Sequence, residues 1–180
     1  MNLNRNIASL LNYKLFGISA ATLLWILSIF LCAFLGRWVL TLGKTYLTGH
    51  FAIAVYYVLL AGVVLVFSFF CRKFTFLKLA SGILILLAGI ASYYFLNIAE
   101  ERIHLFQFGF LGALIARDFS IYPGKTQSFL AFAIGASVGV ADEALQFFLP
   151  WRVCDPRDML LDAIGILLGV LIFNSVSRKA

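Results

Sequence analysis

Long apolar runs separated by short charged segments constrain this chain more than any other feature. A helix needs roughly 20 apolar residues to cross the hydrocarbon core of a bilayer, and most of the runs reach that length. Only 12% of the residues are charged and 63% are hydrophobic, whereas soluble globular chains are about 25% charged. These values exclude a water-soluble enzyme and a disordered chain, so the protein is an integral membrane protein.

The apolar runs predict an all-α fold: a polytopic transmembrane helical bundle of about six spans. The predicted spans are residues 17–35, 51–70, 79–98, 103–116, 128–149 and 158–176. The fourth run has 14 residues and is therefore about 21 Å long as a helix, against a hydrocarbon core of about 30 Å. It crosses only with its flanks, and five spans plus a re-entrant fourth segment is the alternative.

The charged residues predict the sidedness of the bundle. With both termini in the cytoplasm, nine Lys and Arg residues fall on the inner side and five on the outer side, in agreement with the positive-inside rule. Seven of the eight carboxylates fall in the outer half, and Asp118 is the exception. The basic residues are scattered rather than clustered, so we expect the lipid bilayer as a partner and no nucleic acid.

We expect one membrane domain over residues 1–180, with two halves of different chemistry. Residues 1–98 hold the first three, almost purely apolar, spans, and residues 99–180 carry polar side chains within the helices. The three cysteines, Cys32, Cys71 and Cys154, are an odd number in unrelated contexts, so no disulfide framework is expected.

Polar residues recur at helical spacing in the last three predicted spans. Positions three or four apart share one face of a helix. The stripes are Glu100, Glu101, His104 and Gln107 in the fourth span, Asp142, Glu143 and Gln146 in the fifth, and Asp155, Asp158 and Asp162 around the start of the sixth. All lie toward the outer side, and we expect five of them to line one cavity that opens outward between the last three spans: His104, Asp142, Glu143, Asp158 and Asp162.

Asp142 and Glu143 are the strongest candidates for a functional role. They precede Pro150 by eight and seven residues, which places them roughly 10–12 Å below the surface. An ionised carboxylate at depth costs up to about 2.5–3.5 kcal/mol on insertion scales, so such residues face a cavity or partners. Pairing of each acid with an arginine is the structural alternative, but adjacent acids point in different directions and one arginine cannot satisfy both. For His104, the alternative is a hydrogen-bonded core histidine.

Small residues predict where two helices approach closely. Gly135 and Gly139 form a small-xxx-small step in the fifth span, and Gly165 and Gly169 form another in the sixth. We expect these two steps to pack together and to bring the acidic stripes of the two spans into contact.

The order and spacing of these residues resemble the VanZ-like family of bacterial membrane proteins. The segments that carry the resemblance are ERIHLFQFGFLG from Glu101, DEALQ from Asp142, PWR from Pro150 and DPRDMLLDAIG from Asp155. Gln107 stands where the family more often has Glu, and Asp162 where it more often has Asn. The resemblance implies a multi-pass protein of the bacterial cytoplasmic membrane and a link to resistance against the glycopeptide antibiotic teicoplanin. It implies no particular reaction.

Two kinds of function fit the outer acids. In an enzyme, Asp142 or Glu143 serves as general base, His104 as acid, base or ligand, and Arg152 clamps an anionic group of a lipid-linked or cell-envelope substrate. In a non-catalytic binding protein, the same pocket recognises a lipid headgroup, a cell-wall precursor or a partner helix. In either case the expected substrate-binding residues are Glu101, Gln107, Gln146, Arg152, Asp155, Asp158 and Asp162.

The charge of the predicted pocket is strongly negative. Seven acids face three arginines and one histidine on the outer side. Such a pocket repels phosphate, so it should hold a metal, hold a cationic group, or keep some of its carboxyls protonated. The identity of any metal or cofactor is left open by the sequence.

Overall fold

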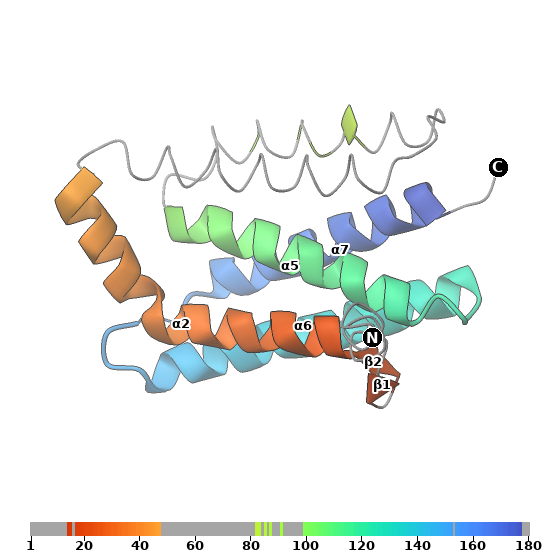
Figure 1. The fold of residues 1–180 in the computed structure, drawn as a ribbon, viewed down its shortest axis with the longest axis horizontal. Coiled ribbons are helices and arrows are strands. Elements are labelled where there is room, and N and C mark those ends of the chain that lie inside the picture. Colours follow the sequence, from red (N-terminus) through yellow and green to blue (C-terminus); the bar gives the residue numbers. More distant parts are fainter. Residues whose placement is uncertain are drawn as a thin grey trace, which may run out of the picture.

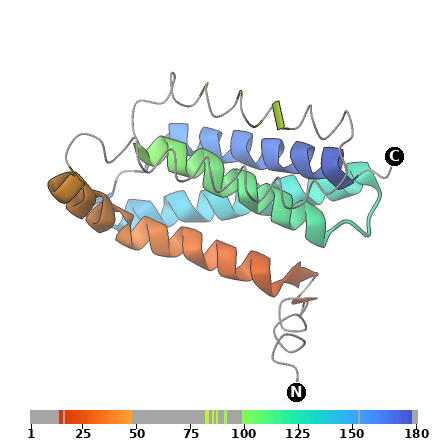
Figure 2. The ribbon, with the colours of Figure 1, turned by 45° about the horizontal axis from the view of Figure 1, so that its top comes forward.

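The computed structural model describes residues 14–47 except 16, isolated positions between 82 and 91, and residues 99–177 except 153. Within these residues the fold consists of four long helices preceded by a very short hairpin. The helices are α2 (Ala20–Leu47), α5 (Ala99–Asp118), α6 (Gly124–Phe148) and α7 (Pro156–Ser177). They form a bundle in which α5 and α6 lie between α2 and α7 (Figures 1 and 2).

Three of these helices are long and apolar enough to cross a membrane: α2 over Ala20–Gly43, α6 and α7. They correspond to the first, fifth and sixth predicted spans, and this part of the helical-bundle prediction is confirmed. The second and third predicted spans, 51–70 and 79–98, lie outside the described residues apart from the isolated helical positions.

The fourth predicted span is an unbroken helix that is longer than its apolar run. α5 has 20 residues and is therefore about 30 Å long, because it continues through charged residues at both ends. The predicted boundaries 103–116 were too narrow, because the helix continues past the last apolar residues of the run at both ends. α5 reaches the thickness of a bilayer core only with its polar flanks.

The chain before α2 departs from the all-α prediction. Strands β1 (Lys14–Leu15) and β2 (Ile18–Ser19) pair antiparallel, and Gly17 between them adopts a φ of 85°, which a residue without Cβ tolerates. The first predicted span covered residues 17–35, whereas α2 begins at Ala20 and continues to Leu47. Ser19 is held before the helix because its hydroxyl accepts a hydrogen bond from the Thr22 N–H (3.4 Å), as an N-terminal cap does.

Among the described helices, α5 and α7 approach each other closely through glycines. A Cβ on Gly165 would lie 2.6 Å from the Leu105 carbonyl oxygen, and a Cβ on Gly169 would overlap the Gly109 carbonyl. Only glycine lets the two backbones approach this closely. The expectation that Gly165 and Gly169 face the small-residue step of α6 is therefore wrong: their partner is α5.

The glycines of α6 also face α7, but they meet side chains. A Cβ on Gly135 would lie 3.0 Å from the Ile166 side chain, and one on Gly139 would lie 3.0 Å from Oδ2 of Asp162. These two glycines make room for side chains rather than for a neighbouring backbone.

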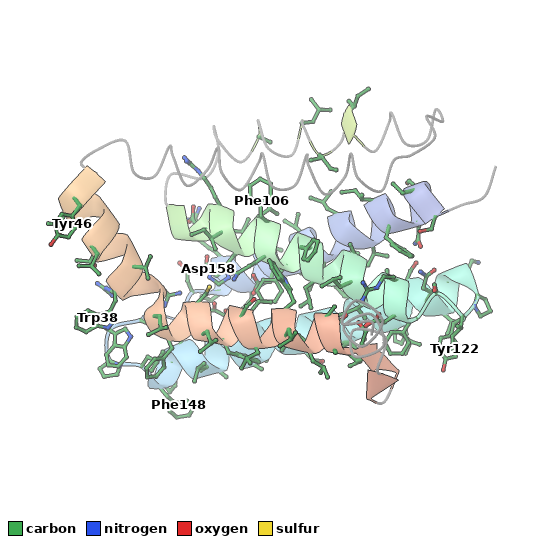
Figure 3. The ribbon with its side chains drawn as sticks, viewed as in Figure 1. Trp38, Tyr46, Phe106, Tyr122, Phe148 and Asp158 are labelled. Atoms are coloured by element: carbon green, nitrogen blue, oxygen red, sulfur yellow. The ribbon has the colours of Figure 1, made fainter. Side chains whose placement is uncertain are left out.

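An apolar core holds the described helices together. Its fully buried members are Ile29 from α2, Phe108, Leu111, Ile115 and Ala116 from α5, Ala131 from α6 and Ile166 from α7. Large apolar side chains on the outer faces are exposed, and aromatic residues mark both ends of the bundle: Trp38 and Tyr46 at one end and Tyr122 at the other (Figure 3). This distribution suits contact with lipid and with the membrane–water interface.

Candidate functional site

Three helices bring three ionisable side chains to one point. One ring nitrogen of His104 (α5), one carboxylate oxygen of Glu143 (α6) and one of Asp162 (α7) all lie within 4.8 Å of one another. Each of these residues is at most 6% exposed. The glycine crossing of α5 and α7 lies beside them, because Gly165 is one turn from Asp162. We call this group, together with Asp142 and Gln146, the acid site.

His104 is fixed in place by a hydrogen bond and a stacked ring. Its Nδ1 lies 3.0 Å from Oδ1 of Asp162, and its ring stacks nearly parallel on Phe108, with an interplanar angle of 4°. A carboxylate on one ring nitrogen favours the tautomer with the proton there. Nε2 is then the nitrogen left for a ligand or a reacting proton.

Gln146 connects the two adjacent acids of α6. Its Nε2 donates to Oδ2 of Asp142 (3.1 Å) and to Oε1 of Glu143 (2.9 Å). Its Oε1 accepts a hydrogen bond from Nε of Arg152 (3.0 Å), and Oε2 of Glu143 accepts one from the Asp155 N–H (3.1 Å). The Gln146 amide thus forms hydrogen bonds with both carboxylates and with Arg152. The sequence alone did not reveal this connection.

Other predicted site residues stabilise the start of α7. Oδ1 of Asp155 accepts a hydrogen bond from the Arg157 N–H (2.9 Å), and Pro156 follows as the first helical residue, so Asp155 caps the helix. Glu101 is buried, and its Oε1 lies 3.7 Å from the exposed guanidinium of Arg157. Asp158 lies one turn before the acid site and is half-buried.

Two carboxylate oxygens of the acid site are buried without a donor. Within the described residues, Oδ1 of Asp142 and Oδ2 of Asp162 have no hydrogen-bond partner, although their residues are only 2% and 1% exposed. A buried acceptor of this kind normally finds a donor, because leaving it unpaired is costly. The acid site is therefore arranged to receive something that carries positive charge or a proton.

A cavity of about 400 Å³ connects α2 to the acid site. Its apolar wall comes from α2, with Ile29, Ala33 and Val39 among the lining residues, and its polar end includes His104 and Asp142. Gln107 and Arg152 also line it. We call this cavity the α2 groove. The predicted cavity lay between the last three spans, whereas here the first span forms one wall.

Aromatic and polar contacts hold α2 over the loop that carries Arg152. The rings of Phe34 and Trp151 pack edge to face with their centroids 5.8 Å apart, and Nη1 of Arg37 donates to the Trp151 carbonyl. Both contacts tie the far half of α2 to the turn between α6 and α7, which closes the groove at that end.

Cys154 lies exposed in the same turn. Partial desolvation, and then the negative charge of Glu143, raise the pKa of its thiol above the ordinary value. A raised pKa keeps the thiol protonated at neutral pH and makes it a poor nucleophile.

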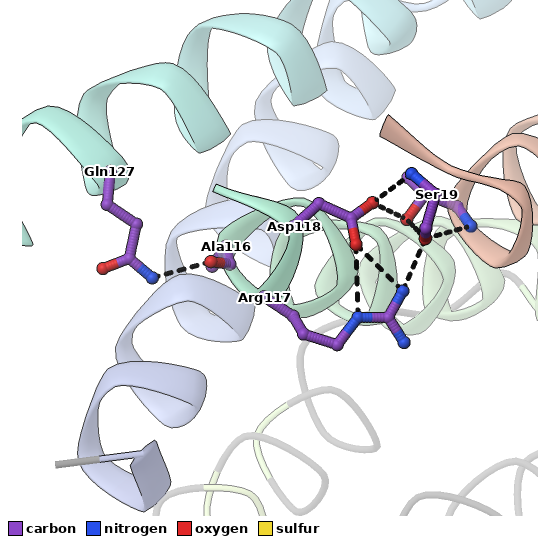
Figure 4. A network of polar contacts seen from close by, with 6 residues as sticks. Ser19, Ala116, Arg117, Asp118 and Gln127 are labelled. Atoms are coloured by element: carbon purple, nitrogen blue, oxygen red, sulfur yellow. Dashed lines mark hydrogen bonds and ion pairs between the residues drawn. The ribbon is translucent and has the colours of Figure 1, made fainter. Parts of the chain in front are cut away.

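A second polar network lies at the opposite end of α5 (Figure 4). Oδ2 of Asp118 accepts hydrogen bonds from the Ser19 N–H (2.8 Å) and the Thr22 hydroxyl (2.6 Å), and Oδ1 pairs with Arg117 (3.0 Å). Burial alone would raise the pKa of Asp118, but these hydrogen bonds outweigh it and hold the pKa below its usual value. The network fastens the start of α2 to the end of α5.

Gln127 adds a further tie at the same end, because its Nε2 donates to the Ala116 carbonyl (2.7 Å). Sequence reasoning treated Asp118 only as an isolated acid and missed its partners. The Ser19-x-x-Thr22 spacing at the start of an apolar run was the available signal, since hydroxyl residues there cap helices.

Comparison with known proteins gives one match. A family model described as VanZ/LLP1 matches residues 20–177, which include all four described long helices and every residue of the acid site. No curated protein and no solved structure matches the chain.

Proposed function

The chain belongs to the VanZ/LLP1 family, and from this premise we propose that its acid site acts by acid–base chemistry on a lipid-linked or cell-envelope substrate. The site would work at the outer boundary of the bacterial cytoplasmic membrane. His104 and one of the two α6 acids, Asp142 or Glu143, would move the proton, and Arg152 would anchor an anionic group of the substrate.

The observation that carries this proposal is that His104 contacts both the acid site and the α2 groove. Its ring is held by Asp162 in the acid site, and His104 also lines the α2 groove. A volume of about 400 Å³ is in the range of small-molecule sites. An amphiphile would fit this shape, with its apolar chain against α2 and its polar head at the acid site.

The chemistry follows from the hydrogen bond between His104 and Asp162. With Nδ1 donating to the carboxylate, Nε2 can take a proton from water or from a substrate hydroxyl, and Asp162 stabilises the imidazolium that forms. Hydrolysis or group transfer at the headgroup is the reaction class that such a pair serves. A cell-wall precursor as substrate would connect the site to the glycopeptide resistance that the family resemblance implies.

A non-catalytic binding role is the second candidate, and the hydrogen bonds of Glu143 favour it. Both of its carboxylate oxygens already accept hydrogen bonds, one from Gln146 and one from the Asp155 backbone. Hydrogen bonds to a carboxylate disfavour its protonation, so Glu143 as arranged serves recognition and structure better than proton transfer, while each oxygen keeps a lone pair for a cation. Asp142, with one oxygen unpaired, is the better base of the two.

The test uses the purified full-length protein in vesicles of total lipid from a bacterial cytoplasmic membrane, with lipids followed by mass spectrometry. Gly36→Trp should fill the groove without a backbone clash, because a Cβ there meets nothing within 4 Å. Leu24→Trp adds the same ring to an exposed position of α2 outside the groove and serves as the matched control.

Three outcomes separate the candidates. Conversion of one lipid by the wild type and by Leu24→Trp, lost in Gly36→Trp and His104→Gln, supports the enzyme. Retention of one lipid without conversion, lost in Gly36→Trp, supports the binding role. Identical lipid content in the wild type and all variants would refute both.

A further inference from the structure

We propose that the acid site is a divalent metal site of the transition-metal type, with His104, Glu143 and Asp162 as the core ligands and Asp142 beside them. This inference does not depend on the lipid substrate. It concerns what the buried carboxylates hold, and it stands on distances, unpaired oxygens and charge.

The spacing of the three core ligands is close to that of a metal site. Two ligands of one ion are separated by at most twice the metal–ligand distance; this upper limit is about 4.4 Å for zinc, slightly less than the spread seen here. The three ligand atoms lie within 4.8 Å of one another, on three different helices. Side-chain adjustment alone brings such atoms onto one ion.

The unpaired oxygens provide an independent indication. Oδ1 of Asp142 and Oδ2 of Asp162 are buried without donors within the described residues. Asp142 lines the same cavity as His104, so its unpaired carboxylate belongs to the group around the histidine. A cation at this point would satisfy oxygens for which the surrounding described side chains offer no hydrogen.

The charge of the described site points the same way. Asp142, Glu143 and Asp162 are almost fully buried, whereas Arg152, which donates a hydrogen bond to Gln146, is only half-buried. Negative charge in a poorly solvated region requires compensation. A divalent ion supplies two positive charges at the centre of the group.

The surrounding hydrogen bonds fit those of a metal centre. Ligating carboxylates are commonly held by hydrogen bonds from neighbouring groups. Here Gln146 orients Asp142 and Glu143, and Nδ1 of His104 lies 3.0 Å from Oδ1 of Asp162, close enough for both atoms to bind one ion. One imidazole among carboxylate oxygens suits Zn²⁺ or Mn²⁺ better than Mg²⁺ or Ca²⁺, which prefer oxygen alone.

The test measures metal content of the full-length protein in lipid nanodiscs after separate equilibration with Zn²⁺ and with Mn²⁺ and removal of free ion. We expect one ion per chain for one of the two metals, and a loss of at least ten-fold in affinity in His104→Gln and in Glu143→Gln. Asp118→Asn is the matched control, because it changes another buried acid at the far end of α5 and should keep the full metal content.

Binding of Co²⁺ to the wild-type protein gives a second measurement that does not depend on whether a variant folds. The wild-type protein should show visible absorption bands of protein-bound cobalt, which zinc should displace. Less than one tenth of an ion per chain with both metals, or equal metal content in His104→Gln, would overturn the metal site. Absence of bound metal in a protein that still converts or retains the lipid would overturn the metal site alone and leave the proposed function intact.

Discussion

At the scale of single residues, Gln146 explains how two adjacent acids are buried in one helix. Neighbouring positions on a helix diverge by about 100°, so a single arginine could not reach both Asp142 and Glu143. The amide of Gln146, four and three residues further on, reaches both and connects them to Arg152. The stripe was visible in the sequence at helical spacing, but the direction of each hydrogen bond was not.

Glu143 offers a test that separates charge from structure. Glu143→Gln keeps the shape and an oxygen for the Asp155 N–H but turns its own NH2 toward the Gln146 NH2, so it should lower the free energy of unfolding by about 1 kcal/mol. Glu143→Ala leaves the Gln146 and Asp155 donors unpaired and should cost about 1–3 kcal/mol. Thermal unfolding in detergent measures both values.

The same pair of variants reports on function. We expect Glu143→Gln to insert and accumulate normally and still to fail the envelope phenotype, because the carboxylate charge is lost. A folded Glu143→Gln protein with wild-type phenotype would remove Glu143 from the functional residues. A misfolded one would assign it a purely structural role.

Asp118, the last residue of α5 and beyond the predicted span 103–116, gives a prediction on pH. Its pKa is lowered in the folded protein, so its contribution to stability is complete above the unfolded value of about 3.9 and is lost as the pH falls through the lower folded value. At pH 7, Asp118→Asn should cost about 1–3 kcal/mol. The difference between wild type and variant should shrink below about pH 4, and a difference independent of pH would contradict this origin.

At the scale of elements, hydropathy located helices but not their ends or partners. The predicted spans 128–149 and 158–176 lie close to α6 (Gly124–Phe148) and α7 (Pro156–Ser177), because each apolar run is bounded by proline or polar residues. The end of α5 and the start of α2 were misplaced, since both are set by Asp118, whose bonds to Ser19 and Thr22 join residues about a hundred positions apart.

The crossing of α5 and α7 should be the most sensitive helix contact to added volume. Gly169→Ala places a methyl group against the Gly109 carbonyl, and the two backbones must separate. We expect a loss of about 1–3 kcal/mol in the free energy of unfolding. Gly124→Ala at the open start of α6, where a Cβ meets nothing within 4 Å, is the control and should be neutral or stabilising. Equal effects of the two variants would contradict the close crossing.

At the scale of the whole molecule, the sequence placed the site residues together but missed one wall of the cavity. The stripes predicted that His104, Glu143 and Asp162 share one end of the bundle, and the structure brings all three within 4.8 Å. That α2 covers this end depends on contacts such as Phe34 with Trp151, which join residues more than a hundred positions apart. No periodicity within a helix encodes such a contact.

The orientation of the bundle can be tested at Cys154, which is exposed between α6 and α7. In a variant with Cys32 and Cys71 replaced by alanine, a membrane-impermeant maleimide should label Cys154 in intact cells, because the predicted outer side includes this turn. Its raised pKa should make labelling slower at neutral pH than that of a free cysteine and faster as the pH rises. Labelling only after permeabilisation would place the acid site on the cytoplasmic side.

The most direct test of the central claim is an experimental density map of the wild-type protein in nanodiscs of bacterial membrane lipid. The claim is that α2, α5, α6 and α7 form one site in which an apolar groove ends at buried acids and a histidine. The map should show an elongated chain along Ala33 of α2, with its polar head in contact with His104. A map in which His104, Glu143 and Asp162 lie beyond contact distance of one another, or in which α2 is separated from them by bulk lipid, would contradict it.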